Sequence, residues 1–235
     1  MPKVGKRILK AMAGASNTLA KRKYTLRRVV VMVAKVLLSA HWNPAILSKA
    51  KNYNISNMQE WTQQIDEITQ KFTEAFGSLS NEQLNWKPDP NTWSIAQNID
   101  HLITINETYF PITKAIRQGD YRLPFTAKFG FLVRFFGDQI LKASQPERKN
   151  KMKTFPVWEP ASSKVPTGII ERFKTHQETL KKWIEDAQGL AAQGQVISSP
   201  ANKYIVYKLE KAFEIIVNHE RRHFNQAKGV YEALP

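Results

Sequence analysis

Two histidines near the C-terminus, His219 and His223, lie four residues apart in a segment whose apolar residues recur at helical spacing. This spacing predicts one continuous helix from about Lys203 to Ala233. Positions i and i+4 share one face of an α-helix, and here that face carries the apolar stripe and points into the protein. A buried imidazole needs a partner, and two imidazoles one turn apart reach the same metal ion. The segment therefore predicts a core-facing helix whose paired histidines need a partner, and a metal ion is one such partner, with hydrogen-bonded core histidines as the alternative.

Three earlier segments repeat this spacing of apolar residues and predict helices at about residues 58–78, 95–117 and 167–187. Ser80 opens a capping box and a short helical turn, and Ser94 opens a second capping box at the start of the 95–117 helix. No strand-like alternation of any length is evident. The pattern predicts an all-α fold, a four-helix bundle.

Residues 118–166 form a long connection between the second and third helices, and they contain five prolines. Their aromatic residues suggest a short helix packed on the body. A connection of this length lets the third helix run parallel to the second instead of returning as a hairpin.

The basic charge of the chain is concentrated at its N-terminus. Residues 1–57 contain 12 Lys and Arg and no Asp or Glu, whereas residues 58–235 contain 23 basic and 20 acidic residues, a net charge of +3. We therefore expect no nucleic-acid binding by the domain, which spans residues 58–235. Residues 1–57 fit a disordered basic arm, an organelle presequence or an over-extended reading frame that truly starts at Met58. No apolar run is long enough to cross a membrane, and a cytoplasmic location is expected.

His101 is the third candidate metal ligand. It lies near the start of the second helix, and His219 and His223 lie toward the end of the fourth. If these helices are antiparallel, the three imidazoles come to a similar height, at about 1.5 Å per residue. The chain has no cysteine, so any metal must bind nitrogen or oxygen ligands. Three protein ligands with one open position are typical of catalytic metal sites.

The residues from His219 to His223 also match the H-E-x-x-H motif of zinc peptidases. That interpretation is rejected, because no suitable third ligand follows and no strands are predicted. Glu220 nonetheless lies beside the two histidines and is a candidate catalytic base. His176 is expected at the surface or in a groove, and His41 lies in the N-terminal segment.

Two sequence blocks resemble the DinB-like (YfiT-like) superfamily. The first runs from Leu79-Ser80 through Leu84-Asn85-Trp86-Lys87-Pro88 and Trp93-Ser94-Ile95 to His101-Leu102, and the second from His219 to Gln226. The resemblance implies an up-down-down-up bundle and a divalent metal, zinc or nickel most often, on His101, His219 and His223. It also implies a metal-dependent transferase that conjugates a low-molecular-weight thiol, such as bacillithiol or mycothiol, to a small electrophile. A homodimer is plausible for this family.

Two other functions remain open from the sequence. One is a metal-dependent hydrolase that uses metal-bound water, with Glu220 as a possible base. The other is a metal-binding stress-response module without catalytic activity. A nucleic-acid role for the basic arm is a further alternative, and it predicts strongly salt-dependent binding that is lost when residues 1–57 are deleted.

Overall fold

The computed structural model describes residues 44–147, 154–160 and 164–235. The chain divides into two units, Met1–Asn52 and Tyr53–Pro235, and the second contains the fold described below. The sequence predictions for residues 1–43, including that for His41, lie outside the described residues. Residues 44–57 belong to a helix, so the domain boundary expected at Met58 falls within a secondary-structure element.

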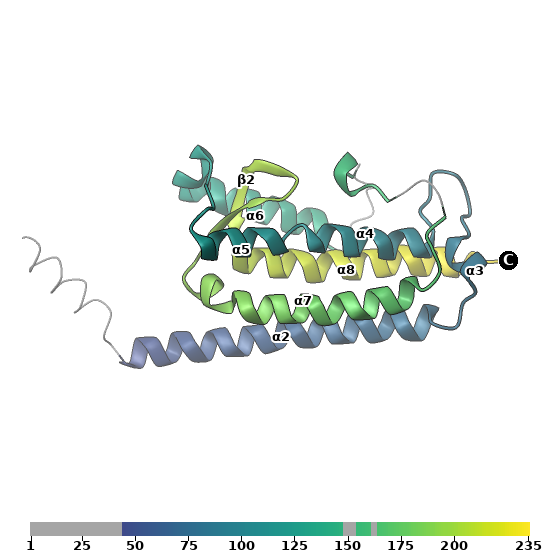
Figure 1. Cartoon of the computed structure of the whole chain (residues 1–235), viewed down its shortest axis with the longest axis horizontal. Coiled ribbons are helices and arrows are strands. Elements are labelled where there is room, and N and C mark those ends of the chain that lie inside the picture. Colours follow the sequence, from purple (N-terminus) through teal and green to yellow (C-terminus); the bar gives the residue numbers. More distant parts are fainter. Residues whose placement is uncertain (1–43, 148–153, 161–163) are drawn as a thin grey trace, which may run out of the picture. The chain divides into compact units, whose positions relative to one another are not determined.

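Four long helical segments form the bundle. They are α2 (Pro44–Phe76), α4 (Ile95–Glu107) continued by α5 (Phe110–Gln118), α7 (Ile169–Ala192) and α8 (Leu209–Tyr231). The first begins before Tyr53, and its residues from Tyr53 on belong to the second unit. Followed by colour along the chain in Figure 1, α2 and α8 run from left to right, whereas α4–α5 and α7 run from right to left, which is the up-down-down-up order. The all-α, four-helix architecture expected from the apolar spacing is thereby confirmed.

Polar caps set the starts of two helices. Ser80 caps α3 (Asn81–Asn85) and Ser94 caps α4, and in both capping boxes the serine side chain accepts from the N3 backbone while a glutamine side chain accepts from the serine N–H. This arrangement satisfies backbone donors that a helix N-terminus leaves unpaired. Both starts agree with the sequence prediction.

The helix predicted at 95–117 is interrupted. α4 ends at Glu107 and α5 starts at Phe110, with Pro111 in the first turn of α5. Proline has no N–H to donate and is tolerated only in the first turn of a helix. The chain therefore ends one helix and starts another.

The expectation that the chain has no strands was wrong. β1 (Val196–Ser199) and β2 (Asn202–Lys208) pair antiparallel, with Ile197 opposite Tyr207. The last helix consequently starts at Leu209 and not near Lys203. These strands are too short to give a clear alternation, and their pairing is stabilised by burial of Ile197, Val206 and Tyr207. The Tyr207 hydroxyl also lies 2.9 Å from the Tyr109 hydroxyl.

The long connection contains a helix packed on the body, as expected, although this helix has 15 residues and is not short. It includes the 3₁₀ turns η1 (Phe125–Lys128) and η2 (Pro156–Trp158) and the helix α6 (Gly130–Ser144). α6 approaches β2 and α8 closely at Gly137, where an added Cβ would lie 3.2 Å from Tyr207 Cβ and from Lys211 Cγ. Glycine at this position allows the close contact.

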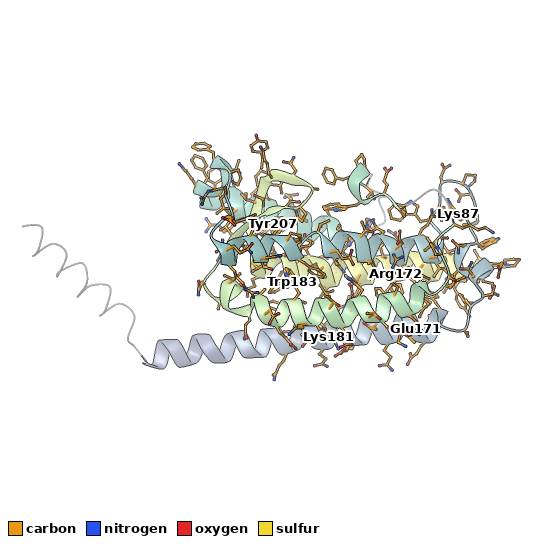
Figure 2. The ribbon with its side chains drawn as sticks, viewed as in Figure 1. Lys87, Glu171, Arg172, Lys181, Trp183 and Tyr207 are labelled. Atoms are coloured by element: carbon orange, nitrogen blue, oxygen red, sulfur yellow. The ribbon has the colours of Figure 1, made fainter. Side chains whose placement is uncertain are left out.

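Aromatic side chains from several helices fill the core between the long helices. Phe72 contacts Phe173 and Phe224 at ring-centroid distances of 4.8 and 5.2 Å. Trp183 of α7 is buried, and its indole N–H donates to Thr113 Oγ1 over 2.8 Å (Figure 2). None of the described helices combines the length and apolar character needed to cross a membrane.

Candidate metal centre

The antiparallel packing of α4 and α8 brings three histidines together. The ring centroid of His101 lies 5.2 Å from that of His219 and 4.7 Å from that of His223, and the two α8 rings are 4.5 Å apart. One potential ligand atom from each ring lies within 4.8 Å of the other two. Among the described residues, this group consists of the three histidines that the sequence analysis singled out.

Hydrogen bonds fix the tautomers of two of these imidazoles. His101 Nδ1 lies 2.7 Å from the Trp158 carbonyl oxygen, which only accepts, so Nδ1 carries the hydrogen. His223 Nδ1 lies 2.8 Å from Asn98 Oδ1, and the Asn98 amide nitrogen donates to the Ser94 carbonyl. The orientation of Asn98 therefore places an acceptor against His223. In both neutral rings the lone pair is on Nε2, the atom left to bind a metal.

The spacing of the Nε2 atoms of His219 and His223 fits a shared ion. The two nitrogens are 3.1 Å apart. Two nitrogens at about 2.0–2.1 Å from one tetrahedral ion would be separated by about 3.3 Å. The two ring nitrogens thus already lie at nearly the separation that a metal requires. A donor set made only of imidazoles suits first-row transition metals such as zinc, copper, iron and nickel.

Desolvation favours the neutral form of all three rings, of which His101 and His223 are buried and His219 is half-buried. Desolvation lowers the pKa of His101, and it holds the pKa values of His219 and His223 well below the ordinary value. The neighbouring imidazoles lower the last two pKa values further. Since only a neutral imidazole offers a lone pair, the rings are in the state that a metal ligand needs at neutral pH.

Two contributions to this centre were not anticipated from the sequence. Asn98 lies one turn before His101 on the same helix face, so its position could have been recognised from spacing. Trp158 contributes a backbone carbonyl from the long connection, and a carbonyl has no sequence signature. The Trp93 ring also lines the centre, with its centroid 4.9 Å from that of His101 and 5.9 Å from that of His223.

Glu220 is buried in the bundle beside the histidine pair, and its contacts are with other helices. Its two carboxylate oxygens accept 2.8 Å hydrogen bonds from the side-chain amides of Asn106 on α4 and Gln177 on α7. Burial raises its pKa to about 7, although both hydrogen bonds act in the opposite direction. A single helical residue rotates the side-chain direction by about 100°, so Glu220 leaves α8 in a different direction from His219.

His176 was expected at the surface or in a groove, and its side chain is buried in the wall of a pocket. Its side chain is 3% exposed and its ring stacks on Phe110. It also lines a pocket together with Glu107 and Arg172, and burial lowers its pKa to about 4. The apolar residues around it on α7 place it on the inner face of the helix.

Comparison with known proteins supports the family that the two sequence blocks resemble. A sequence profile of the DinB superfamily matches residues 64–227. No curated protein and no solved structure showed significant similarity to the chain. The match covers the bundle from α2 to α8 and includes all three clustered histidines. The chain belongs to the DinB superfamily.

Proposed function

We propose that this protein binds one divalent metal ion through His101, His219 and His223 and transfers a low-molecular-weight thiol to a small electrophile. The observation that carries the metal site is the convergence of three neutral imidazoles, two of them with Nδ1–H held by buried acceptors. Zinc and nickel are the ions that the family resemblance implies, and both are among the ions that imidazole ligands suit.

Three ligands suit a catalytic site better than a structural one. Structural zinc sites use four protein ligands, whereas catalytic sites use three and leave a position open. The described part of the chain supplies three. When bound there, the ion supplies a Lewis acid that lowers the pKa of a thiol and so favours the nucleophilic thiolate at neutral pH.

The surrounding residues prepare the imidazoles for this role. The Trp158 carbonyl and Asn98 Oδ1 keep hydrogen on the Nδ1 atoms and orient the rings. Burial keeps the rings neutral, and the Trp93 ring packs against His101 and His223. A thiol and its electrophile would react in a site that holds its ligands rigidly before the substrate arrives.

Hydrolysis is less well supported by the contacts of Glu220. A general base must be within hydrogen-bond reach of the proton that it accepts, and both carboxylate oxygens already accept from Asn106 and Gln177. A catalytic role for Glu220 stays a prediction.

The test is an assay of the full chain reconstituted with zinc or nickel. A chlorobimane and a series of small thiols are supplied, and both substrates are followed over time. Equal, metal-dependent consumption of thiol and electrophile supports transfer. Loss of the electrophile without loss of thiol indicates hydrolysis instead. If neither substrate is consumed while the metal stays bound, the protein is a metal-binding module without this activity.

A further inference from the structure

An exposed aromatic surface lies on the side of the second unit formed by η1, α6 and β2. Large apolar side chains that are exposed together in one patch often mark an interaction site. The members of this patch are 38 to 66% exposed, and they are Leu123, Phe125, Phe129, Phe131, Phe135 and Tyr204. We call this set the aromatic surface. Figure 2 shows aromatic rings projecting from the ribbon near β2 and the helical turn beside it.

The underlying elements hold the aromatic surface in place. The Thr126 hydroxyl of η1 donates to the Tyr204 carbonyl of β2 over 2.9 Å. α6 turns Val133 and Gly137 toward the body, so Phe131 and Phe135, which lie one turn apart, are left on its outer side. These rings are therefore exposed by a packed structure and are not the ends of a loose loop.

Basic residues surround these rings without acidic ones between them. Residues 121–137 contain Arg122, Lys128 and Arg134, residues 187–209 contain Lys203 and Lys208, and neither stretch contains Asp or Glu. Asp120 and Asp138 lie just outside the first stretch. The surface thus combines exposed apolar rings with a local positive charge.

We propose that the aromatic surface docks on an anionic lipid bilayer. Phenylalanine rings insert at the boundary between headgroups and acyl chains, and Lys and Arg contact anionic headgroups. The charge of the surface complements such a bilayer. Residues 1–57, with 12 basic and no acidic residues, would add electrostatic attraction to an anionic membrane.

The charges and ring contacts disfavour two other partners for the aromatic surface, a second copy of the chain and single-stranded nucleic acid. A second copy of the chain would bring like charges together across a symmetric interface. Single-stranded nucleic acid stacks its bases on open ring faces, but Lys128 Nζ lies over the Phe125 ring at 5.6 Å and Lys203 Nζ lies over the Tyr204 ring at 5.2 Å. Phe125 and Phe129 further cover each other edge to face, at 5.0 Å.

Because the N-terminal segment can attract vesicles by itself, the test must report which surface touches the lipid. The chain has no cysteine, so Phe135→Cys in the full chain is labelled at one site with an environment-sensitive nitrobenzoxadiazole dye. Lys182→Cys on α7, where the lysine side chain is 77% exposed, is the matched control. Both proteins are titrated with vesicles of phosphatidylglycerol and phosphatidylcholine, and with phosphatidylcholine alone.

We expect a blue shift and a gain in intensity for the label at 135 on anionic vesicles only, and no change at 182. Vesicle binding without a response at 135, or an equal response at both positions, would overturn the proposal. A response to rising protein concentration without lipid would assign the surface to a second copy, and a response to oligothymidylate would assign it to nucleic acid. Each result would overturn the membrane assignment.

Substitutions in unlabelled full-length protein give an independent readout. Arg134→Gln/Lys203→Gln should weaken binding to anionic vesicles about 25-fold, at about fivefold per basic residue. Lys174→Gln/Lys182→Gln on α7 changes the net charge equally and should have much less effect. Phe131→Ala/Phe135→Ala should weaken binding by about tenfold or more, whereas Tyr231→Ala, an exposed aromatic on α8, should not. Equal losses in the paired variants would refute a specific docking surface.

Discussion

Removal of the Asn98 side chain tests how the histidine centre is prepared for a metal. In Asn98→Ala, His223 loses the 2.8 Å hydrogen bond to Asn98 Oδ1 that fixes hydrogen on Nδ1. His223 and Asn98 are both buried, so water does not readily replace the lost acceptor. The ring can then rotate or take the other tautomer, in which Nε2 carries the hydrogen and cannot bind a metal.

The expected cost is a 10- to 100-fold weaker metal affinity, which corresponds to about 1.4–2.7 kcal/mol of binding free energy. Asn98→Asp keeps an acceptor against Nδ1 and should retain most of the affinity. It loses the donor to the Ser94 carbonyl, so its free energy of unfolding should fall by about 1 kcal/mol.

Competition for zinc against a chromophoric chelator measures this affinity directly. The matched control is Asn85→Ala, which removes an amide that hydrogen-bonds the Val165 backbone in both directions and does not contact the histidines. Equal zinc affinity in Asn98→Ala and the parent, with both proteins folded, would refute the reasoning. If Asn98→Asp bound zinc as weakly as Asn98→Ala, the role assigned to the hydrogen-bond acceptor at position 98 would be refuted.

Three further substitutions have defined outcomes. Burial lowers the pKa of His176 from 6.5 to about 4, although the Glu107 carboxylate lies 3.8 Å away. Between these two pH values His176 binds a proton more tightly in the unfolded chain than in the folded one, so the free energy of unfolding falls as the pH drops from 6.5 to 4. His176→Leu should reduce the loss of unfolding free energy between pH 7.5 and pH 4.5 by up to about 3 kcal/mol, as measured by urea unfolding at the two pH values. A pH dependence equal to that of the parent would contradict this role of His176. Glu220→Gln should leave the thiol-transfer rate within about threefold of the parent, because the carboxylate contacts Asn106 and Gln177; a loss of about 100-fold or more would instead identify a base. Phe173→Ala should cost about 3–5 kcal/mol in denaturant unfolding, since this ring is fully buried, and a cost below about 1 kcal/mol would contradict its place in the core.

Much of the fold follows from local patterns in the sequence. Ser80 and Ser94 mark helix starts that the structure reproduces, because a capping box is a property of four consecutive residues. The inward faces of α4 and α8 follow from apolar spacing, and antiparallel packing then brings His101 to His219 and His223. These inferences need only helix geometry.

The features that were missed depend on contacts between distant residues. The β1–β2 hairpin depends on tertiary burial of Ile197 and Tyr207. Its sequence has no long alternation of apolar and polar residues that would predict strands. Trp158 reaches His101 through a backbone carbonyl across 57 positions. The break between α4 and α5 at Pro111 was foreseeable, but apolar spacing that continued through it favoured one helix.

Bound metal is the most direct test of the central claim. The full chain and a His219→Ala/His223→Ala variant are loaded with zinc or nickel, freed of excess metal and measured by elemental analysis. The account predicts about one ion per parent chain and essentially none in the variant, with both proteins still helical by circular dichroism. An absence of metal in the parent after loading, or equal metal in parent and variant, would contradict the assignment of His101, His219 and His223 as a metal centre.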